Sequence, residues 1–205
     1  RGHAAGIKAP GGVVLRTDTE GSFVETFAGG LRNAYDIAFN RRGDLFTYDS
    51  DMEWDSGLPW YRPTRVNLLT PGAECGWRSG WAVWPEYFFD SLPAVLNTGR
   101  GSPTGVAAYQ HVMYPRRYHD ALFVGDWAGG RILAVRMRPQ GGSYTAEVET
   151  FVEGRPLNVT DLAVGPDGAL YFCTGGRGTS GGIYRVVWNG RVPPAMTDLG
   201  RGTEA

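Results

Sequence analysis

The sequence has little of what marks several classes of protein. It has two cysteines in 205 residues, Cys75 and Cys173, which stand far apart and outside any CxxC or His/Cys cluster, so a zinc site is not expected. They form either one disulfide or two isolated thiols. No apolar run approaches the roughly 18 residues that span a bilayer, and no transmembrane segment is expected. With 20 basic and 21 acidic residues, the chain lacks the basic excess of a nucleic-acid-binding protein.

Glycine and proline are plentiful, at 31 and 13 residues. Hydrophobic residues nevertheless reach 42% and aromatic residues 13%, fractions that disordered glycine-rich chains do not have. The glycines therefore indicate turns between short strands. No stretch has a sustained 3.6-residue apolar period, and this excludes long helices.

The chain also repeats itself, which is typical of solenoids and propellers. Each copy reads as short apolar or alternating strands bounded by Gly, Pro or Asp turns. The matching segments are 24–27 (VETF) with 148–151 (VETF), 36–39 (DIAF) with 161–164 (DLAV), and 45–48 (LFTY) with 170–173 (LYFC), and a partial third copy is 120–124 (DALFV). The spacing from Leu122 to Leu170 matches one propeller blade of roughly 40–50 residues.

These repeats predict an all-β fold, a β-propeller with about four blades. Because an open ring would expose unpaired strand edges, we expect this chain to be part of a larger, six-bladed ring. The predicted propeller covers residues 1–190, with a long loop insertion at about 49–98, and residues 191–205 form a linker or tail. The chain begins with Arg1 rather than Met, so we expect its natural start to be missing or processed, and the absence of a signal sequence carries no weight.

Four carboxylates alternate with other residues inside the predicted insertion. They are Asp49, Asp51, Glu53 and Asp55. Oxygen ligands at this density suit calcium, with Asp49 and Asp51 the favoured ligands, although the run is not an EF-hand loop. The alternative is that the carboxylates form salt bridges to Arg62 and Arg65.

Aromatic residues crowd the same insertion. They are Trp54, Trp60, Tyr61, Trp77, Trp81, Trp84, Tyr87, Phe88 and Phe89. Rings on a rim loop would suit a sugar or a flat quinone. The alternative is that most of them pack as a small subdomain that covers the insertion.

Several motifs together carry a family resemblance. The motifs are 30–33 (GLRN), 43–45 (GDL), 72–77 (GAECGW), 102–109 (SPTGVAAY), 114–127 (YPRRYHDALFVGDW) and 164–171 (VGPDGALY). Over residues 11 to 188 the sequence resembles the glucose/sorbosone dehydrogenase family, and the runs 46–55 and 59–65 are similar to its bacterial branch of membrane-bound and L-sorbosone dehydrogenases. The resemblance implies a six-bladed propeller with pyrroloquinoline quinone (PQQ) and calcium. It also implies a periplasmic or extracytoplasmic location, oxidation of a sugar or other alcohol or aldehyde, and electron transfer to a cytochrome c domain or protein.

The resemblance also assigns residues. Arg32 and Asn33 would hold the cofactor, since a guanidinium can pair with quinone or carboxylate oxygens in a fork. Asp126 and Trp127 would line the pocket, unless Trp127 instead packs between blades. The general base of such an enzyme is a histidine in an earlier blade, so we expect it upstream of Arg1 and expect this chain alone to be inactive. The chain's own histidines are His3, His111 and His119, of which the last two are predicted to lie on the surface.

Some positions depart from the family pattern. Ala128, Asn158 and Thr160 stand where the family has cationic residues, and Tyr35 stands where it has glutamine. PQQ carries three carboxylates, which are costly to bury without cations. Either other arginines substitute for the missing cations, with Arg131, Arg155 and Arg177 as candidates, or the domain does not bind PQQ.

In the second case, the alternative function is a non-catalytic propeller that binds carbohydrate or protein. A third hypothesis is a calcium-dependent propeller hydrolase such as a lactonase, for which Asn33, Asp126 and Asp161 are the plausible ligands.

Overall fold

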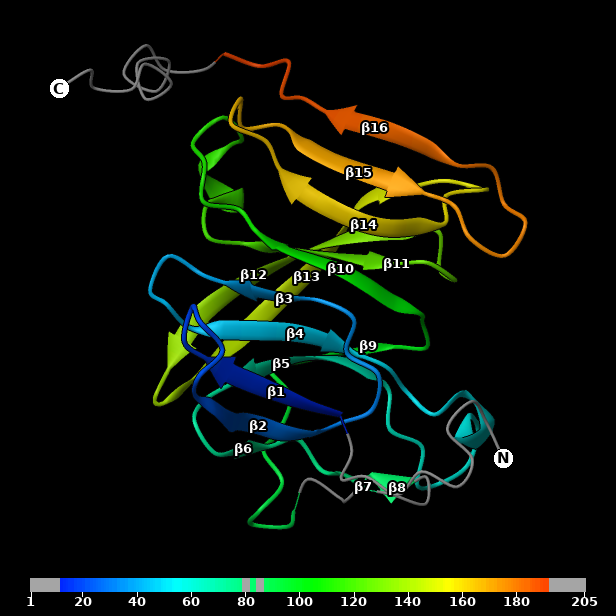
Figure 1. The fold of residues 1–205 in the computed structure, drawn as a ribbon. Helices are drawn as coiled ribbons and strands as arrows, with labels where there is room; N and C mark the ends of the chain where they lie inside the picture. The colour runs from blue at the N-terminus through cyan, green and yellow to red at the C-terminus, as the bar shows by residue number, and fades with distance from the viewer. Residues whose placement is uncertain (1–11, 79–81, 84–86, 192–205) are drawn as a thin grey trace, which may run out of the picture.

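The computed structural model describes residues 12–78, 82–83 and 87–191. These residues form four β-sheets that are stacked one after another, together with a small two-stranded hairpin. Figure 1 shows the stack running from β1 and β2 at one end to β16 at the other. The prediction of an all-β propeller is confirmed, and the four sheets correspond to its blades.

Within each sheet the strands follow one another mainly as an antiparallel meander. The first sheet contains β1 (Gly12–Thr17), β2 (Val24–Leu31) and β6 (Ala73–Glu74), of which β6 pairs parallel to β2. The second contains β3 (Ile37–Phe39), β4 (Leu45–Asp49), β5 (Thr64–Leu69) and β9 (Leu96–Gly99). The third contains β10 (Pro103–Ala108), β11 (Leu122–Asp126), β12 (Arg131–Gln140) and β13 (Ser143–Glu153). The fourth contains β14 (Val159–Val164), β15 (Leu170–Thr174) and β16 (Gly182–Val186).

The remaining elements are short. They are the hairpin β7 (Trp77–Arg78) with β8 (Ala82–Val83), and the 3₁₀ helices η1 (Glu53–Asp55) and η2 (Arg116–Tyr118). The predicted insertion at about 49–98 is more than a loop, because it supplies β5 and β9, the third and fourth strands of the second sheet. None of the described helices is long and apolar enough to cross a membrane.

The first strands of consecutive sheets lie against one another, as the blades of a propeller require. Thr104 Oγ1 on β10 donates to the carbonyl of Val159 on β14, at 3.0 Å. On the other side of β10, the amide of Val106 donates to Asp36 Oδ2, just before β3, at 2.8 Å. Gly105, between them, has no room for a side chain, because a Cβ there would lie 2.5 Å from Asp161 Oδ1.

Apolar layers fill the spaces between sheets. Buried residues such as Ala28, Leu31 and Leu69 pack together between the first and second sheets, while Phe46, Val66 and Leu133 do so between the second and third. The layer between the third and fourth sheets is aromatic, and in it the rings of Tyr109 and Tyr114 stack with centroids 4.6 Å apart. Each sheet thus buries a face against its neighbour.

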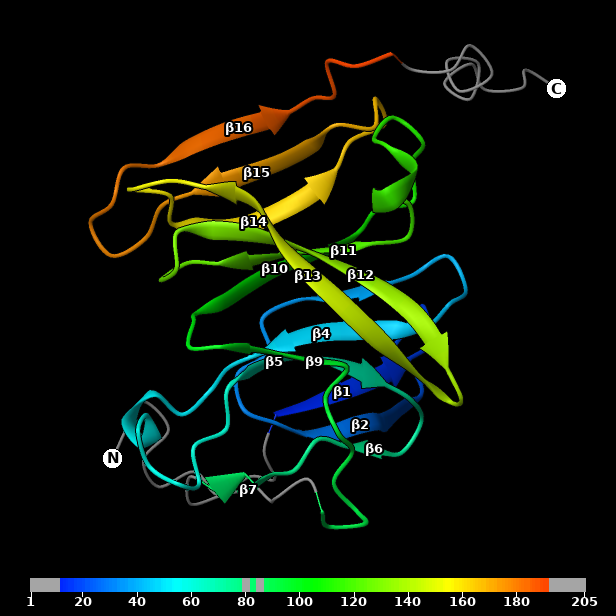
Figure 2. The same ribbon diagram turned by 180° about the vertical axis from the view of Figure 1, so that it is seen from behind.

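The long hairpin of β12 and β13 extends beyond its own sheet. Figure 2 shows it crossing the back of the molecule toward the second sheet. Near its tip, the Tyr144 ring meets the Phe46 ring edge-on at 5.4 Å between centroids, and the Tyr144 hydroxyl bonds to Asn40 and Asp44. The hairpin therefore ties the second and third sheets together at their outer side.

Both cysteines are free thiols. Burial raises the pKa of the Cys75 thiol to about 12, so it remains protonated at neutral pH. Residues 1–11 and 192–205, which include His3 and most of the predicted linker, lie outside the described residues, as do Trp81 and Trp84.

Candidate functional site

The turn that contains Arg32 and Asn33 is held by a buried carboxylate. Asp49, the last residue of β4, is completely buried and accepts hydrogen bonds from the backbone amides of Arg32 at 2.9 Å and Asn33 at 2.8 Å. It also accepts one from the Ser50 amide at 2.9 Å. A buried carboxylate needs such donors, and here backbone amides supply them. Asp49 therefore fixes the loop that leads into the second sheet.

Asp126, the last residue of β11, has the same role one sheet further along the chain. It too is completely buried, and its Oδ1 accepts from the amides of Ser102 at 2.8 Å and Gly129 at 3.0 Å. Its Oδ2 accepts from Arg131 Nε at 2.9 Å, forming an ion pair. Asp126 thus lies beneath the loop surface, and Arg131 is engaged there rather than free to bind a ligand.

A cleft of about 670 Å³ opens above these two carboxylates. It is formed by loops at one end of the sheets, where β4, β11 and β15 finish, on the right in Figure 1. The lining residues are Arg32, Asn33, Ser50, Asp51, Glu53, Arg100, Gly101, Ser102, Trp127, Ala128, Gly129 and Arg177. Of the predicted site residues, the fold brings Arg32, Asn33, Asp51, Glu53 and Trp127 together here, whereas Asp49, Asp55 and Asp126 are not part of the lining.

Arg32 is a partly buried cation at one wall of the cleft. Its Nη2 forms an ion pair with Glu53 Oε2 at 3.0 Å and lies 3.9 Å from Met52 Sδ. The guanidinium carbon lies 5.6 Å from the centroid of the Trp77 ring. Its neighbour Asn33 is exposed. The ion pair and the ring restrict the orientation of Arg32, which lines the cleft.

Asp51 is a nearly buried carboxylate of the cleft, only 4% exposed. Its Oδ2 accepts a hydrogen bond of 2.6 Å from the Tyr61 hydroxyl. Burial raises the pKa of Asp51, and the nearby charge of Glu53 raises it further, although the Tyr61 bond acts in the opposite sense. The pKa of Tyr61 is also raised, mainly by burial and secondarily by this hydrogen bond to Asp51.

The four predicted metal ligands are therefore divided among different tasks. Asp49 binds backbone amides, Asp51 binds Tyr61, Glu53 pairs with Arg32, and Asp55 lies half-buried in η1. In the described part of the chain, no group of three or more His, Cys, Asp or Glu side chains is arranged to hold a metal ion. As placed, these carboxylates do not fit calcium as a set. The alternative of salt bridges to Arg62 and Arg65 does not occur either, since no ion pair joins those residues among the described ones.

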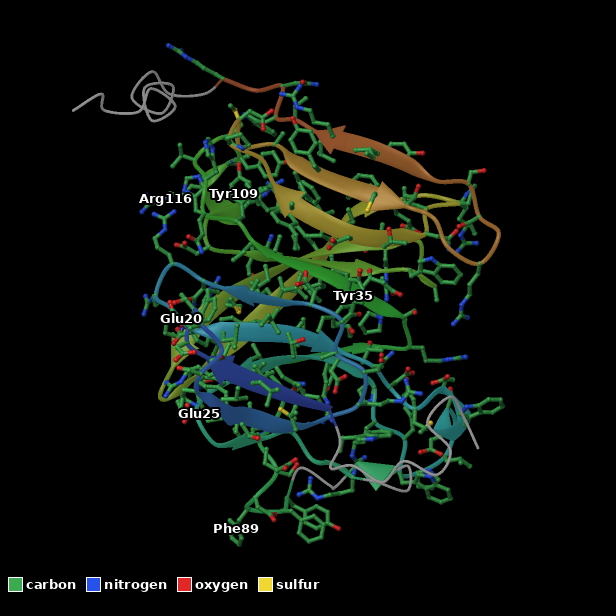
Figure 3. All side chains as sticks on the ribbon, viewed as in Figure 1. Glu20, Glu25, Tyr35, Phe89, Tyr109 and Arg116 are labelled. Atoms are coloured by element: carbon green, nitrogen blue, oxygen red, sulfur yellow. The ribbon has the colours of Figure 1, made fainter. Side chains whose placement is uncertain are left out.

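Aromatic residues of the 54–89 stretch are dispersed. Trp77 is buried, whereas Trp54 and Trp60 are 80% and 58% exposed. Tyr87 stacks loosely on Phe88, with ring centroids 5.1 Å apart. Phe89 is fully exposed, and Figure 3 shows it at the lower end of the molecule, beyond the first sheet. The rings that the structure describes do not form one packed subdomain.

Two arginines of the cleft lie far from Arg32 in the sequence. Arg100 follows β9 and Arg177 follows β15, and both are exposed. The Arg177 guanidinium lies over the Trp127 ring, 5.5 Å from its centroid. Trp127 is fixed by its own bonds, because its Nε1 donates to the Gly175 carbonyl at 2.7 Å and its carbonyl accepts from Asn158 at 2.9 Å. Trp127 therefore both lines the cleft and joins the third sheet to the fourth.

The positions where the resemblance expects cations have other tasks. Ala128 lines the cleft without charge, Asn158 holds Trp127, and Thr160 Oγ1 bonds to the Cys173 carbonyl at 3.2 Å. Tyr35 is 66% exposed and lines a second, smaller cavity of about 440 Å³ that also reaches Arg32. Arg177 was one of three predicted substitutes and does reach the cleft. Arg100 carries no motif, so sequence reasoning missed it.

The described histidines lie away from the cleft. His111 Nδ1 accepts from the Met113 amide at 3.0 Å, and His119 Nε2 lies 2.9 Å from the Tyr114 carbonyl. Both belong to the loop around η2, at the end of the sheets where Figure 3 labels Tyr109 and Arg116. The cleft loops lie at the other end. The expected general base thus remains a prediction.

Solved structures match this arrangement, although no protein-family model and no curated protein sequence matches the chain. A glucose dehydrogenase-type oxidoreductase from Thermus thermophilus aligns with 78% of this chain and 47% of its own, at 24% identity and a TM-score of 0.62. The PQQ-bound aldose sugar dehydrogenase from Streptomyces coelicolor aligns with 85% and 51%, at 20% identity and 0.61. The soluble aldose sugar dehydrogenase from Escherichia coli aligns with 78% and 46%, at 20% identity and 0.60.

The chain has the β-propeller fold of the sugar dehydrogenases. At these identities the likeness establishes the fold, and the chemistry has to be argued from the cleft. The chain spans about half the length of the solved structures that it matches. The fold expected from the motifs is therefore the fold observed.

Proposed function

We propose that this chain is part of a PQQ-dependent dehydrogenase of the glucose/sorbosone type, which oxidises a sugar or another alcohol or aldehyde. The observation that carries the proposal is the cleft, which is lined by three arginines and by Trp127. The backbone of its loops is held by two buried carboxylates, Asp49 and Asp126. Its volume of about 670 Å³ lies in the usual range for small-molecule sites. PQQ is flat and carries three carboxylates, so the donors present fit its chemistry.

Three of the lining residues have a definite task in this proposal. Arg32 offers a planar fork of donors to a carboxylate or quinone oxygen, and Glu53 holds that fork in place. Trp127 supplies a flat apolar wall. When bound, PQQ supplies the oxidant for the substrate's hydride. Asp51 is a buried carboxylate of the cleft, and burial raises its pKa.

A carbohydrate substrate is supported by the sequence resemblance and by the likeness to sugar dehydrogenases of known structure. Electron transfer to a cytochrome and a periplasmic or extracytoplasmic location are supported only by the sequence resemblance. Calcium is not included in the proposal, because the carboxylates of residues 49–55 do not gather into a cage.

Calorimetric titration of the full-length protein that contains this chain with PQQ tests the proposal. We expect one PQQ per chain, and Arg32→Ala should weaken binding by about tenfold or more, the value of one charge-assisted contact. Arg116→Ala is the matched control, since Arg116 is an exposed arginine at the opposite end of the sheets. If the folded full-length protein does not bind PQQ, the proposal is wrong.

The second candidate is a non-catalytic propeller that binds carbohydrate or protein. It is favoured by two observations: the described cleft lining contains no histidine, and the exposed Trp54 adjoins Glu53 of the cleft. Carbohydrate binding in the absence of PQQ, weakened by Trp54→Ala, would favour this function over the dehydrogenase.

A further inference from the structure

The described lining of the cleft has three arginines and two carboxylates, Asp51 and Glu53. Arg32 is paired with Glu53, so much of its charge is already neutralised. Within the part of the chain that the structure describes, no ion pair joins Arg100 or Arg177 to a carboxylate. Both side chains nevertheless line the same cleft. Two guanidinium groups without carboxylate partners in one concave site are suited to an anionic ligand.

The backbone of Arg177 is in an unfavourable conformation. Its φ is +50°, in the left-handed region that residues with a Cβ seldom occupy, and glycines flank it on both sides, Gly176 at +86° and Gly178 at +79°. Asp120, away from the cleft, also has a positive φ of 62°, so the conformation alone does not mark a ligand site, but it sets the direction in which the Arg177 side chain leaves the turn.

The turn that contains Arg177 is also anchored to the third sheet. Gly175 accepts the Trp127 indole hydrogen bond, which anchors the turn to the third sheet at 2.7 Å. The Trp127 ring in turn lies under the Arg177 guanidinium. An arginine stacked on a fixed ring keeps its in-plane donors free for a carboxylate.

The backbone next to Arg100 is held by Asp126. It precedes Gly101, where an added Cβ would lie 2.9 Å from Asp126 Oδ2, so only glycine fits there. Ser102, the next residue, donates its amide to the same carboxylate at 2.8 Å. The buried Asp126 therefore fixes the backbone immediately after Arg100, as it fixes the loop that carries Trp127 and Gly129.

We propose that Arg100 and Arg177 form a carboxylate-anchoring pair that replaces the cations missing at residues 128, 158 and 160. The ligand class is a flat polycarboxylate, and PQQ is the member that the proposed function requires, so this inference rests on the proposed function. It assigns ligand binding to two loops, after β9 and after β15, that no motif marks.

The test compares PQQ with its trimethyl ester, which lacks the carboxylate charges, by calorimetry on the full-length protein. We expect Arg177→Ala and Arg100→Ala each to weaken PQQ binding between about tenfold and about a hundredfold, with little effect on the ester. Arg177→Lys, which keeps the charge but loses the planar fork, should weaken binding less than Arg177→Ala. Arg116→Ala should change nothing, and an unchanged unfolding midpoint in each variant shows that the fold is retained.

The outcomes separate the two proposals. If wild type binds PQQ and both alanine variants bind it equally well, the anchoring pair is wrong and the proposed function stands. If wild type binds a flat tricarboxylate that is not a quinone, benzene-1,3,5-tricarboxylate, through Arg100 and Arg177 but does not bind PQQ, the anchoring pair stands and the proposed function is wrong. If neither anion binds, both are wrong.

Discussion

Asp49 and Asp126 occupy the same position in consecutive sheets and hold the same kind of turn. Each ends the second strand of a four-stranded sheet, is completely buried, and accepts amides from the loop that leads into the first strand of that sheet. The cleft therefore rests on two buried carboxylates. In the fourth sheet Thr174 stands at the end of β15, and there the Trp127 indole and Asn158 hold the neighbouring backbone instead.

Removing either carboxylate should destabilise the protein. In Asp49→Ala, three backbone amide donors lose their buried acceptor, and we expect the free energy of unfolding to fall by about 3 kcal/mol or more. Asp126→Ala should have a similar effect, because it also leaves Arg131 without its partner. Urea unfolding of the full-length protein measures both. Asp55→Ala is the control, and a loss as large as that of Asp49→Ala would contradict this structural role.

Gly105 should not tolerate even a methyl group. A Cβ there would lie 2.5 Å from Asp161 Oδ1 and 2.8 Å from the Leu162 amide, so the inner strands β10 and β14 would have to separate. We expect Gly105→Ala to lower the free energy of unfolding by roughly 1–3 kcal/mol or more. Gly142→Ala, in open space at a hairpin turn, should be nearly neutral by the same urea measurement. Equal effects for the two variants would argue against the close packing of β10 on β14.

Asp51 should make stability depend on pH in a definite direction. Its pKa is raised from 3.8, so the native state favours the protonated form, and its contribution to stability is present at low pH and is lost as pH rises through the native pKa. Asp51→Asn keeps an acceptor for Tyr61 without the charge. We expect this variant to gain stability relative to wild type as the pH is raised from about 3 to about 7. Urea unfolding at several pH values measures the difference, and a flat or falling difference would contradict the assigned burial effect. Asp55→Asn is the control.

Trp127→Phe should weaken PQQ binding with only a small loss of stability, because Trp127 positions the turn that carries Arg177. Phenylalanine keeps a ring under Arg177 but removes the indole donor to Gly175, which lowers stability by only about 1 kcal/mol. Because the 175–178 turn is then less well fixed, PQQ binding should weaken while the unfolding midpoint falls slightly. Calorimetry and thermal unfolding of the same samples measure both quantities. Unchanged affinity would show that the indole bond does not position Arg177.

The chain expressed by itself should self-associate. Large apolar side chains are exposed on both outer sheets, with Leu15 57% and Val24 57% exposed on the first and Ile183 83% exposed on the last. Size-exclusion chromatography with light scattering measures the mass in solution. We expect oligomers, and fewer of them in the Leu15→Ser, Ile183→Ser double variant. A monodisperse monomer with cooperative unfolding would contradict this expectation.

The sequence predicted the fold well because each blade repeats its own strands and turns. The segments 45–48 and 170–173, which match in sequence, are equivalent strands, β4 and β15, of the second and fourth sheets. The Arg32–Asn33 motif likewise predicted one wall of the cleft. Such features are local, and a single stretch of sequence carries them.

The sequence could not predict which partner each polar side chain binds. The run from Asp49 to Asp55 looks like a set of metal ligands, yet Asp49 is satisfied by amides that come from 16 and 17 residues away. Arg100 and Arg177 meet in the cleft only because three sheets bring their loops to one end. Neither fact follows from spacing, since both depend on which loops are neighbours in space.

The most direct test of the proposed cofactor site is a crystal structure of the full-length protein with PQQ. We expect PQQ in the cleft, with its carboxylates within hydrogen-bonding distance of Arg32, Arg100 and Arg177 and its ring system beside Trp127. PQQ bound elsewhere, or a cleft that remains empty at saturating PQQ, would contradict the assignment.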